Sequence, residues 1–359
     1  MSGLMQEMNQ WALDRGLPLS VQLDVTYRCN ERCVHCYLDH DDHGEMTTAE
    51  IKDVLDQVAE AGVFFLTLSG GEVLMRMDFF EIVEHARALL FDVKIKTNAF
   101  MIREPEADRI LDLGVRVVQV SIYSHRSEVH DAITKLPGSL QRSIAGIRLL
   151  QSRGVKVIIA NVLMQQNLSD YAGVKVLAEE LGAGYTIDPT ITPMMDGNRS
   201  IVALGIGGDD LQQVFRNPEL VGNVDEFCAP PPKVDEGVLH DVPCSAGHTA
   251  CYISPYGDVF PCVQFPLPTG NIRWQKFFGY LESFPADERG PLDPGEGPER
   301  LLVVLARQQL HALSRLGLCG RKYVGTIHRG LREVVLPDGR ADGEHAAARV
   351  VETAHSIGQ

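Results

Sequence analysis

Short apolar segments alternate with longer amphipathic segments through the first half of the chain. The apolar segments have the length of strands, and the segments between them repeat apolar residues at helical spacing. The expected strands are 19–26, 63–68, 92–97, 115–122, 155–163 and 185–188, and the expected helices are 47–61, 77–90, 105–113, 139–153 and 169–181. A helix between each pair of strands is typical of parallel sheets in α/β proteins.

Local signals agree with this α/β prediction. Residues 63–68 form an apolar run, which is typical of a strand buried on both faces. The sequence Thr47-Thr48-Ala49-Glu50 resembles a capping box that would open the next helix. Six strand–helix units are too few for a complete eight-unit barrel, so we expect a partial (β/α)6 TIM-like barrel. A doubly wound sheet is the alternative.

The regular alternation stops after Pro193, where glycine, proline and short strand-like segments become frequent. Residues 285–298 are rich in proline and glycine, which is typical of a linker. The expected regions are an N-terminal lead-in at 1–17, the partial barrel at 18–205, a small C-terminal extension at 206–284, and a linker with a divergent tail at 285–359.

Composition limits the classes of partner. The 359 residues carry a formal net charge of −15 and give a pI of about 5.2. An acidic surface repels phosphate backbones, so we expect no nucleic-acid partner. The sequence contains neither an apolar run long enough to span a membrane nor the basic and apolar start of a signal peptide. We therefore expect a cytoplasmic protein with no membrane partner.

The cysteines fall into an N-terminal triplet and a C-terminal group. The triplet is Cys29, Cys33 and Cys36, and the others are Cys228, Cys244, Cys251, Cys262 and Cys319. In a cytoplasmic protein such groups are more often metal sites than disulfides. Closed zinc sites and simple electron-transfer iron–sulfur clusters take four protein ligands. The triplet therefore leaves room for a ligand from outside the protein or, in a zinc site, for His35 or His40.

The spacing Cys29-x3-Cys33-x2-Cys36, on a loop after the first expected strand, resembles that of the radical S-adenosylmethionine (radical SAM) enzymes. This resemblance implies that the three cysteines hold a [4Fe–4S] cluster whose open iron binds S-adenosylmethionine. One electron from the cluster then releases a 5′-deoxyadenosyl radical, which abstracts hydrogen from a substrate. In such enzymes the protein supplies binding and orientation, and the cofactors supply the chemistry.

The resemblance also assigns residues to S-adenosylmethionine. Gly70-Gly71-Glu72 resembles the family's glycine-glycine-glutamate motif, although Val73 replaces the usual proline. Glycine lets the backbone approach a ligand closely, and the carboxylate can bind the methionine ammonium. By position, three polar residues resemble the contacts to the methionine carboxylate or ribose: Asn98, Ser121 and Asn161. His35 stands where the family places an aromatic residue against adenine, a role that Tyr37 can share.

A second resemblance concerns the C-terminal extension. Cys244, followed by Gly257-Asp258-Val259-Phe260-Pro261-Cys262, resembles the start of a SPASM domain, which carries auxiliary [4Fe–4S] clusters in peptide-modifying members. The resemblance implies that Cys244, Cys251 and Cys262 ligate one auxiliary cluster.

The later SPASM cysteines are missing apart from Cys319. The other aligned positions hold Leu310, Leu313 and Tyr323. A second auxiliary cluster is therefore not expected, and the first has lost its usual fourth ligand. The extension is then a reduced one-cluster form, a degenerate domain, or a tail produced by a shifted reading frame.

Three functions compete on these grounds. The first is radical modification of a ribosomally made peptide, which the SPASM-like segment favours. The second is modification of a small cofactor precursor of the heme or quinone type, and the third is a degenerate, non-catalytic iron–sulfur protein. We also expect a separate electron donor of the flavodoxin or ferredoxin type. A separate leader-peptide-binding protein is expected because no recognition domain fits before the first strand.

Overall fold

The computed structural model describes residues 7–10, 12–13, 17–227 and 244–277. Among these, the chain up to Ile206 and the segment 244–277 belong to one compact unit, and residues 207–227 belong to a second. Within the described part, no helix is both long and apolar enough to cross a membrane. Cys228, Cys319 and the tail at 285–359 lie outside the described residues. The expected regional boundaries stay a prediction.

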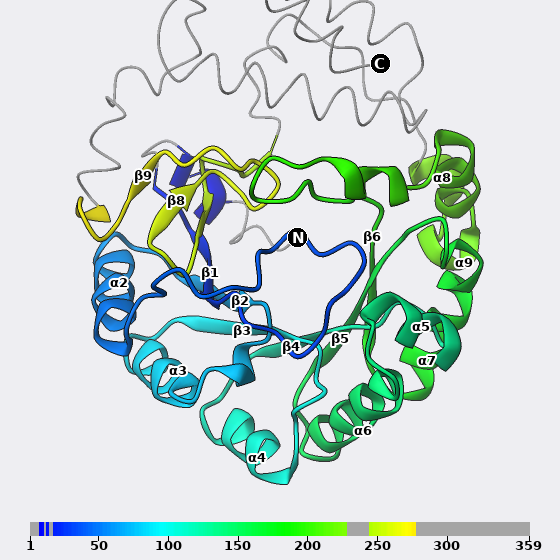
Figure 1. Ribbon diagram of the computed structural model, residues 1–359, viewed down its shortest axis with the longest axis horizontal. Helices are drawn as coiled ribbons and strands as arrows, with labels where there is room; N and C mark the ends of the chain where they lie inside the picture. Colours follow the sequence, from blue (N-terminus) through cyan, green and yellow to red (C-terminus); the bar gives the residue numbers. More distant parts are fainter. Residues whose placement is uncertain (1–6, 11, 14–16, 228–243, 278–359) are drawn as a thin grey trace, which may run out of the picture. The chain divides into compact units, whose positions relative to one another are not determined.

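The first unit is built on six parallel strands with helices between them (Figure 1). The strands are β1 (Ser20–Thr26), β2 (Phe65–Gly70), β3 (Asp92–Thr97), β4 (Val117–Ser121), β5 (Val157–Val162) and β6 (Gly184–Asp188). The helices are α2 (Thr48–Glu60), α3 (Phe79–Ala88), α4 (Glu104–Asp112), α5 (Ser127–Thr134), α6 (Ser139–Ser152) and α7 (Tyr171–Glu180), with 3-10 turns η1 (Val73–Met75), η2 (Leu168–Asp170) and η3 (Ser200–Leu204). The predicted α/β class and partial barrel are confirmed.

Two predicted helices differ in detail, and α5 and the helices described in the second unit were not predicted. The expected helix at 77–90 is the shorter α3, and the expected helix at 169–181 begins with the turn η2 and continues as α7. The sequence predicted no element between residues 122 and 139, because the short helix α5 gives little periodic signal. The second unit holds α8 (Gly208–Phe215), α9 (Pro218–Val221) and α10 (Val224–Phe227).

The two faces of the sheet differ in chemistry. Alternate residues of each strand point toward the surrounding helices and form the core with apolar side chains such as Leu23, Leu68, Ile95 and Ile159. The other face carries polar side chains, and it is the inner face of the curved sheet in Figure 1. The expectation that residues 63–68 are buried on both faces is wrong, because Thr67 lies on this half-exposed inner face.

The C-terminal extension continues the same sheet. Strand β7 (Ala250–Ile253) pairs in parallel with β1, and β8 (Asp258–Phe260) and β9 (Gly270–Asn271) follow antiparallel. The sheet therefore has nine strands, in the order β6-β5-β4-β3-β2-β1-β7-β8-β9. The sequence predicted short strands here, but it gave no sign that they join the edge of the barrel.

Helix α2 begins as predicted. The Thr47 hydroxyl accepts a hydrogen bond from the Glu50 backbone N–H, and the Glu50 carboxylate accepts one from the Thr47 N–H at 2.7 Å. This reciprocal cap satisfies two of the free N–H groups at the helix start, which is worth about 1 kcal/mol. It fixes the point where the loop after β1 ends.

Gly146→Ala should destabilise the protein by about 1–3 kcal/mol, although alanine is ordinarily the better helix former by about 1 kcal/mol. A Cβ at position 146 of α6 would lie 2.6 Å from the Ala99 carbonyl oxygen and 3.2 Å from Ile102 Cβ. Urea unfolding measures the change. The exposed Arg148→Ala in the same helix is the control, expected to stay within about 0.5 kcal/mol of the wild type. A Gly146→Ala protein that is as stable as the wild type contradicts this packing.

Candidate active site

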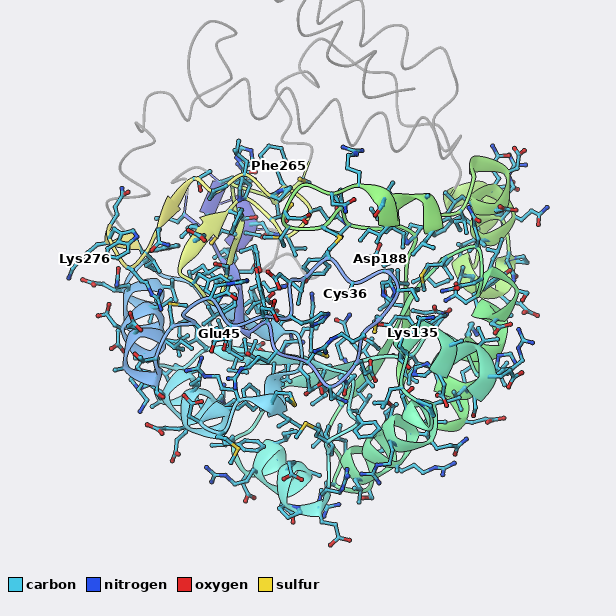
Figure 2. All side chains as sticks on the ribbon, in the orientation of Figure 1. Cys36, Glu45, Lys135, Asp188, Phe265 and Lys276 are labelled. Atoms are coloured by element: carbon cyan, nitrogen blue, oxygen red, sulfur yellow. The ribbon has the colours of Figure 1, made fainter. Side chains whose placement is uncertain are left out.

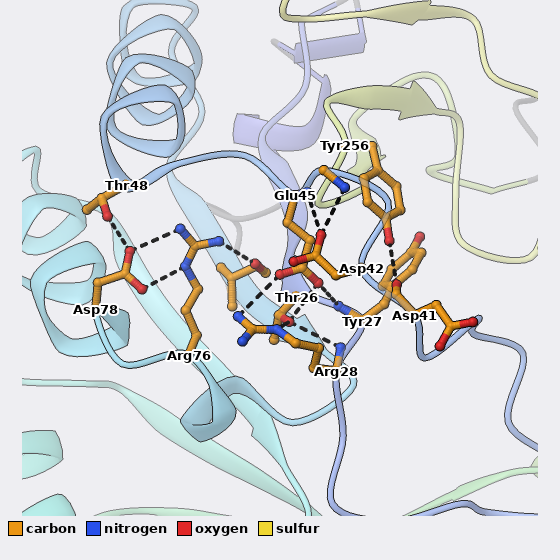
Figure 3. A network of polar contacts seen from close by, with 12 residues as sticks. Thr26, Tyr27, Arg28, Asp41, Asp42, Glu45, Thr48, Arg76, Asp78 and Tyr256 are labelled. Atoms are coloured by element: carbon orange, nitrogen blue, oxygen red, sulfur yellow. Dashed lines mark hydrogen bonds and ion pairs between the residues drawn. The ribbon is translucent and has the colours of Figure 1, made fainter.

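The loop between β1 and α2 carries Cys29, Cys33 and Cys36 as free, half-buried thiols. Its two ends are tied together, because Glu45 accepts hydrogen bonds from the Thr26 hydroxyl and the Tyr27 N–H, both at 2.7 Å (Figure 3). In the view of Figure 2, Cys36 lies inside the arc formed by the helices. The loop is therefore a closed structure at the carboxyl end of β1.

Helix α5 holds the middle of this loop. The backbone N–H groups of Arg32 and Val34 donate to the carbonyl oxygens of Thr134 and Ile133, each at 3.0 Å. These carbonyls are in the last turn of α5, where helix C=O groups lack intrahelical partners. The unpredicted helix thus uses its free carbonyls to position the residues between the cysteines.

The thiols lie in surroundings that favour their protonated form. Burial raises the pKa of Cys29 to about 12, and burial likewise raises the pKa of Cys33 and of Cys36. The carboxylates of Glu31 and Glu72 act in the same direction on Cys29. A cationic centre that binds thiolates reverses this preference, so metal binding here releases protons.

The spacing of the thiols bears on the zinc alternative. Within the described residues, the only three His, Cys, Asp or Glu side chains with ligand atoms within 4.8 Å of one another are the exposed Asp39, Asp41 and His43. The loop cysteines are not gathered to that spacing, which a single ion with four close ligands requires.

Several buried polar atoms of the loop have no hydrogen-bond partner among the described residues. They are Asn30 Nδ2, Glu31 Oε1 and His35 Nδ1. An unpaired buried polar atom costs about 1–3 kcal/mol, so their concentration beside three thiols fits a site that a polar cofactor completes. His35 packs edge-on against Tyr123, with ring centroids 4.7 Å apart. Whether it contacts adenine stays a prediction.

Glu31 is a site residue that the motif did not suggest. It is buried beside the thiols, with Cys33 Sγ 3.5 Å from its Oε2, and burial raises its pKa to about 7. A charged residue between two ligand cysteines was the available signal. Its inward orientation follows from the hydrogen bonds to α5, which the sequence does not display.

The turn Gly70-Gly71-Glu72 packs directly against the start of the cysteine loop. Gly71 N–H donates to the Thr26 carbonyl at 2.8 Å, and Glu72 N–H donates to the Arg28 carbonyl at 2.9 Å. A Cβ on Gly70, where φ is +143°, would lie 2.1 Å from Thr26 O, and one on Gly71 would lie 2.4 Å from Arg28 O. Both positions therefore require glycine for contact with the chain's own backbone. Their contact with a ligand stays a prediction.

The Glu72 carboxylate is fully buried and joins two strand ends. It accepts hydrogen bonds from the Thr97 hydroxyl at 2.7 and 2.8 Å, from Asn98 N–H at 2.8 Å and from Leu74 N–H at 3.1 Å. Burial raises its pKa, and these hydrogen bonds oppose the rise. The carboxylate therefore fixes the turn that carries Asn98. Its expected contact with a methionine ammonium stays a prediction.

Asn98 brings the end of β3 to the cysteine loop. Its Nδ2 donates to Asn30 Oδ1 at 2.9 Å and lies 4.0 Å from Cys29 Sγ. The next residue, Ala99, has φ of +59°, a left-handed conformation that favours glycine. Of the predicted cofactor contacts outside the loop, Asn98 is the one with a side chain that contacts the cysteine loop.

Ser121 and Asn161 have different surroundings. Ser121, at the end of β4, hydrogen-bonds the Tyr123 hydroxyl, which lies 4.0 Å from Cys33 Sγ. Asn161 is fully buried, and its Nδ2 donates to the Tyr185 hydroxyl at 3.2 Å. In the β4–β5 register the partner of Ser121 is Ala160, so Asn161 points to the opposite face. The structure does not bring Asn161 to the cysteine loop, and its proposed role stays untested.

The cysteines of the C-terminal extension differ in how deeply they are buried. Cys251 lies in the hydrophobic core on β7, where burial raises its pKa to about 12. Cys244 and Cys262 are both half-buried, and Cys244 lies near enough to contribute to the raised pKa of Cys262, of which burial is the main cause. Cys244 and Cys262 are thus neighbours, and the ligand role of all three cysteines stays a prediction.

A buried polar network joins β7 to β1 on the inner side of the sheet. The Tyr252 hydroxyl donates to Asp24 Oδ2 at 3.0 Å and lies 2.6 Å from the Tyr27 hydroxyl. Gln22 Nε2 donates to the other oxygen of Asp24 at 3.2 Å. Burial raises the pKa of Asp24 to about 6, against the lowering effect of the Tyr252 hydrogen bond.

Glu72→Gln should destabilise the protein by about 2–3 kcal/mol. The substitution replaces one carboxylate oxygen by an amide NH2 group, so a backbone N–H that donates to that oxygen loses its acceptor. Urea unfolding measures the loss. Glu81→Gln is the matched control, since Glu81 is exposed and, among the described residues, forms its ion pair with Lys52 Nζ, at 2.6 Å. That variant should change stability by less than about 1 kcal/mol. Equal effects of the two substitutions would contradict the structural role of Glu72.

The stability contribution of Asp24 should depend on pH. Because its pKa is raised from 3.8 to about 6 in the folded state, the contribution is complete below the lower value and is lost as pH rises through about 6. The difference amounts to about 3 kcal/mol. The free energies of unfolding of the wild type and of Asp24→Asn, plotted against pH, should therefore converge or cross between about pH 4 and about pH 7. A stability difference that is constant over this range argues against a buried, raised-pKa carboxyl.

Comparison with known proteins agrees with this geometry. Residues 23–174 match the model of the Radical SAM superfamily. The mycofactocin maturase MftC of Mycobacterium ulcerans (strain Agy99) is 30% identical over 255 residues, which cover 68% of this chain and 68% of that protein. An AdoMet-dependent heme synthase of Methanosarcina barkeri (strain Fusaro / DSM 804) is 29% identical over 282 residues, covering 72% of this chain and 81% of that protein.

A solved structure shares the fold. SuiB of Streptococcus suis, in its crystal structure bound to the precursor peptide SuiA, superimposes with a TM-score of 0.61 at 16% identity, covering 78% of this chain and 68% of that chain. This likeness concerns the fold, whereas the sequence match to the maturase identifies the family. The chain belongs to the radical SAM superfamily of enzymes, as the spacing of Cys29, Cys33 and Cys36 predicted.

Proposed function

We propose that Cys29, Cys33 and Cys36 hold a [4Fe–4S] cluster that binds S-adenosylmethionine, and that the enzyme modifies a ribosomally made peptide. When bound, the cluster supplies the electron that splits S-adenosylmethionine into methionine and a 5′-deoxyadenosyl radical. The protein holds the thiols, orients the cofactor and keeps water from the radical. An external electron donor of the flavodoxin or ferredoxin type and a cytoplasmic location complete the proposal.

The observation that carries the proposal is the contact between the cysteine loop and the turn after β3. Asn98 Nδ2 reaches Asn30 and approaches the Cys29 thiol, while the buried Glu72 carboxylate holds the Asn98 backbone. The turn after β3 is therefore held at the cysteine loop, where burial raises the pKa of all three thiols. Gly70, Gly71, Glu72, Asn98, Ser121 and His35 are the proposed cofactor contacts, and Asn161 is retained as a more distant one.

The peptide substrate is supported by the names of relatives. A mycofactocin maturase is similar over two thirds of both chains, and a fold relative was crystallised with a precursor peptide. The heme synthase relative supports the second candidate, a tetrapyrrole precursor. The two substrate classes share the cysteine loop, so that loop cannot distinguish them.

An auxiliary cluster is part of the proposal. Cys244 and Cys262 are neighbours that two turns of the extension bring together, with Cys251 as the third expected ligand. Iron content after reconstitution tests this assignment. Cys262→Ala should lower the iron per chain, and an unchanged iron content would remove the auxiliary cluster from the proposal.

The radical chemistry is tested by anaerobic reconstitution of the full chain with iron, sulfide and a chemical reductant. The wild type should bind iron and release 5′-deoxyadenosine from S-adenosylmethionine, measured by liquid chromatography and mass spectrometry. Cys36→Ala should abolish that release, and circular dichroism checks that the variant is folded. Folded, iron-loaded wild type that releases no 5′-deoxyadenosine would favour the non-catalytic alternative.

Substrate class is tested separately with the same preparation. Peptides encoded by short reading frames beside the gene form one arm, and a porphyrin that bears propionates forms the other. A mass change that requires both S-adenosylmethionine and reductant identifies the substrate class. A change in the porphyrin but not in any peptide would replace the first candidate by the second.

A further inference from the structure

Two lysines lie next to each other on the inner face of the sheet. Lys94 and Lys96 are two residues apart on β3, so they point to the same side. Lys94 is paired in register with Thr67, which is in turn paired with Gln22, and all three lie on the half-exposed inner face. The cysteine loop follows the carboxyl end of β1, so these side chains lie along the inner face below the proposed cofactor site.

Lys96 lies near the middle of the inner face. Its ammonium donates to Gln22 Oε1 at 2.7 Å, across the intervening strand β2. Burial lowers its pKa, while Asp24 on β1 and Asp188 at the end of β6 act in the opposite direction. The charge of Lys96 is therefore balanced in part by carboxylates of the first and the last parallel strand, β1 and β6.

Gln22 keeps the ammonium and the buried carboxylate apart. Its oxygen accepts from Lys96, and its Nε2 donates to Asp24, which also accepts from Tyr252. Each oxygen of Asp24 therefore accepts a hydrogen bond from a neutral donor. Lys96 uses one of its N–H donors on a neutral amide, and no ion pair of Lys96 is found among the described residues.

Among the described residues, no anion contributes to the shifted pKa of Lys94. The charged groups that shift its pKa are both cations, Lys96 and Arg116, and together with the larger effect of burial they lower it to about 8. Arg116 is itself engaged by Asp92. In the described part of the chain Lys94 makes no hydrogen bond or ion pair. The carboxylates that act on Lys96, Asp24 and Asp188, are not among the groups that act on Lys94. Lys94 and Lys96 repel each other, so an anion beside Lys94 is favoured on electrostatic grounds.

We propose that Lys94 and Lys96 form a subsite for a carboxylate group of the substrate, an inference that rests on the proposed function. The free N–H donors of the two ammonium groups fit the oxygens of one carboxylate. The protein has a net charge of −15, so binding of an anionic substrate requires a local positive site of this kind. A peptide carboxylate and a tetrapyrrole propionate share this chemistry.

Binding measurements on the full chain, reconstituted and supplied with S-adenosylmethionine but no reductant, test the subsite without radical chemistry. One pair of probes is an N-acetylated tripeptide with a free C-terminal carboxylate and its C-terminal amide. The other pair is protohaem and its dimethyl ester. The wild type should prefer the charged member of one pair by roughly tenfold or more. The pair that shows the preference identifies the source of the carboxylate.

Lys94→Met and Lys96→Met should each remove most of that preference, whereas Lys94→Arg should retain it because the positive charge is kept. Lys52→Met is the control, since Lys52 lies on the outer helix α2 and pairs with Glu81. Thermal unfolding shows whether each variant is folded. Failure of the wild type to prefer either charged probe, or an equal loss for charged and neutral probes in the lysine variants, overturns the proposal.

Chemical labelling gives a second, independent readout. Trace acetylation near pH 8 should modify Lys94 readily, and the preferred charged probe should protect Lys94 and Lys96 but not Lys52. Unprotected lysines at saturating probe also overturn the proposal. Release of 5′-deoxyadenosine tests the proposed function separately, so a failure of the subsite is distinguishable from a failure of the radical chemistry.

Discussion

The buried carboxylate of Glu72 fixes the geometry on which the site depends. A buried charge is tolerated only when hydrogen bonds replace its hydration. Here the donors come from η1, from Thr97 and from the Asn98 backbone, so the end of β3 is held against the turn after β2. Asn98 then reaches the cysteine loop. One carboxylate thus connects two strand ends to the thiols of a third element.

The cysteine loop is also held from the opposite side. Helix α5 ends with carbonyl groups that accept from Arg32 and Val34, and Glu45 closes the loop onto Thr26 and Tyr27. Backbone hydrogen bonds of this kind hold the loop without using the cysteine side chains. The thiols and the unpaired polar atoms near them are therefore left for a bound group, which is what a cofactor held by three cysteines requires.

The outer face of the sheet contributes to stability, and the inner face carries the polar groups of the proposed sites. Apolar side chains on the outer face pack against the helices, and burial of these groups supplies most of the stabilisation. The inner face carries Lys94, Lys96 and the Asp24–Tyr252 network. Burying charges there costs free energy. Strand β7 contributes Tyr252 to this network, so the C-terminal extension shapes the same face that the proposed substrate contacts.

The sequence by itself determined the α/β class, the six parallel strands and, through the spacing of Cys29, Cys33 and Cys36, the radical SAM family. Strand and helix periodicity and the spacing of the cysteines are local properties, which a linear sequence displays directly. Tertiary structure alone decided that β7 joins β1, that α5 supports the loop, and that Glu31 turns inward while Asn161 faces away. These outcomes depend on hydrogen bonds and register between distant segments. Such pairings produce no periodic pattern in the sequence, because each segment alone could pair with many other segments.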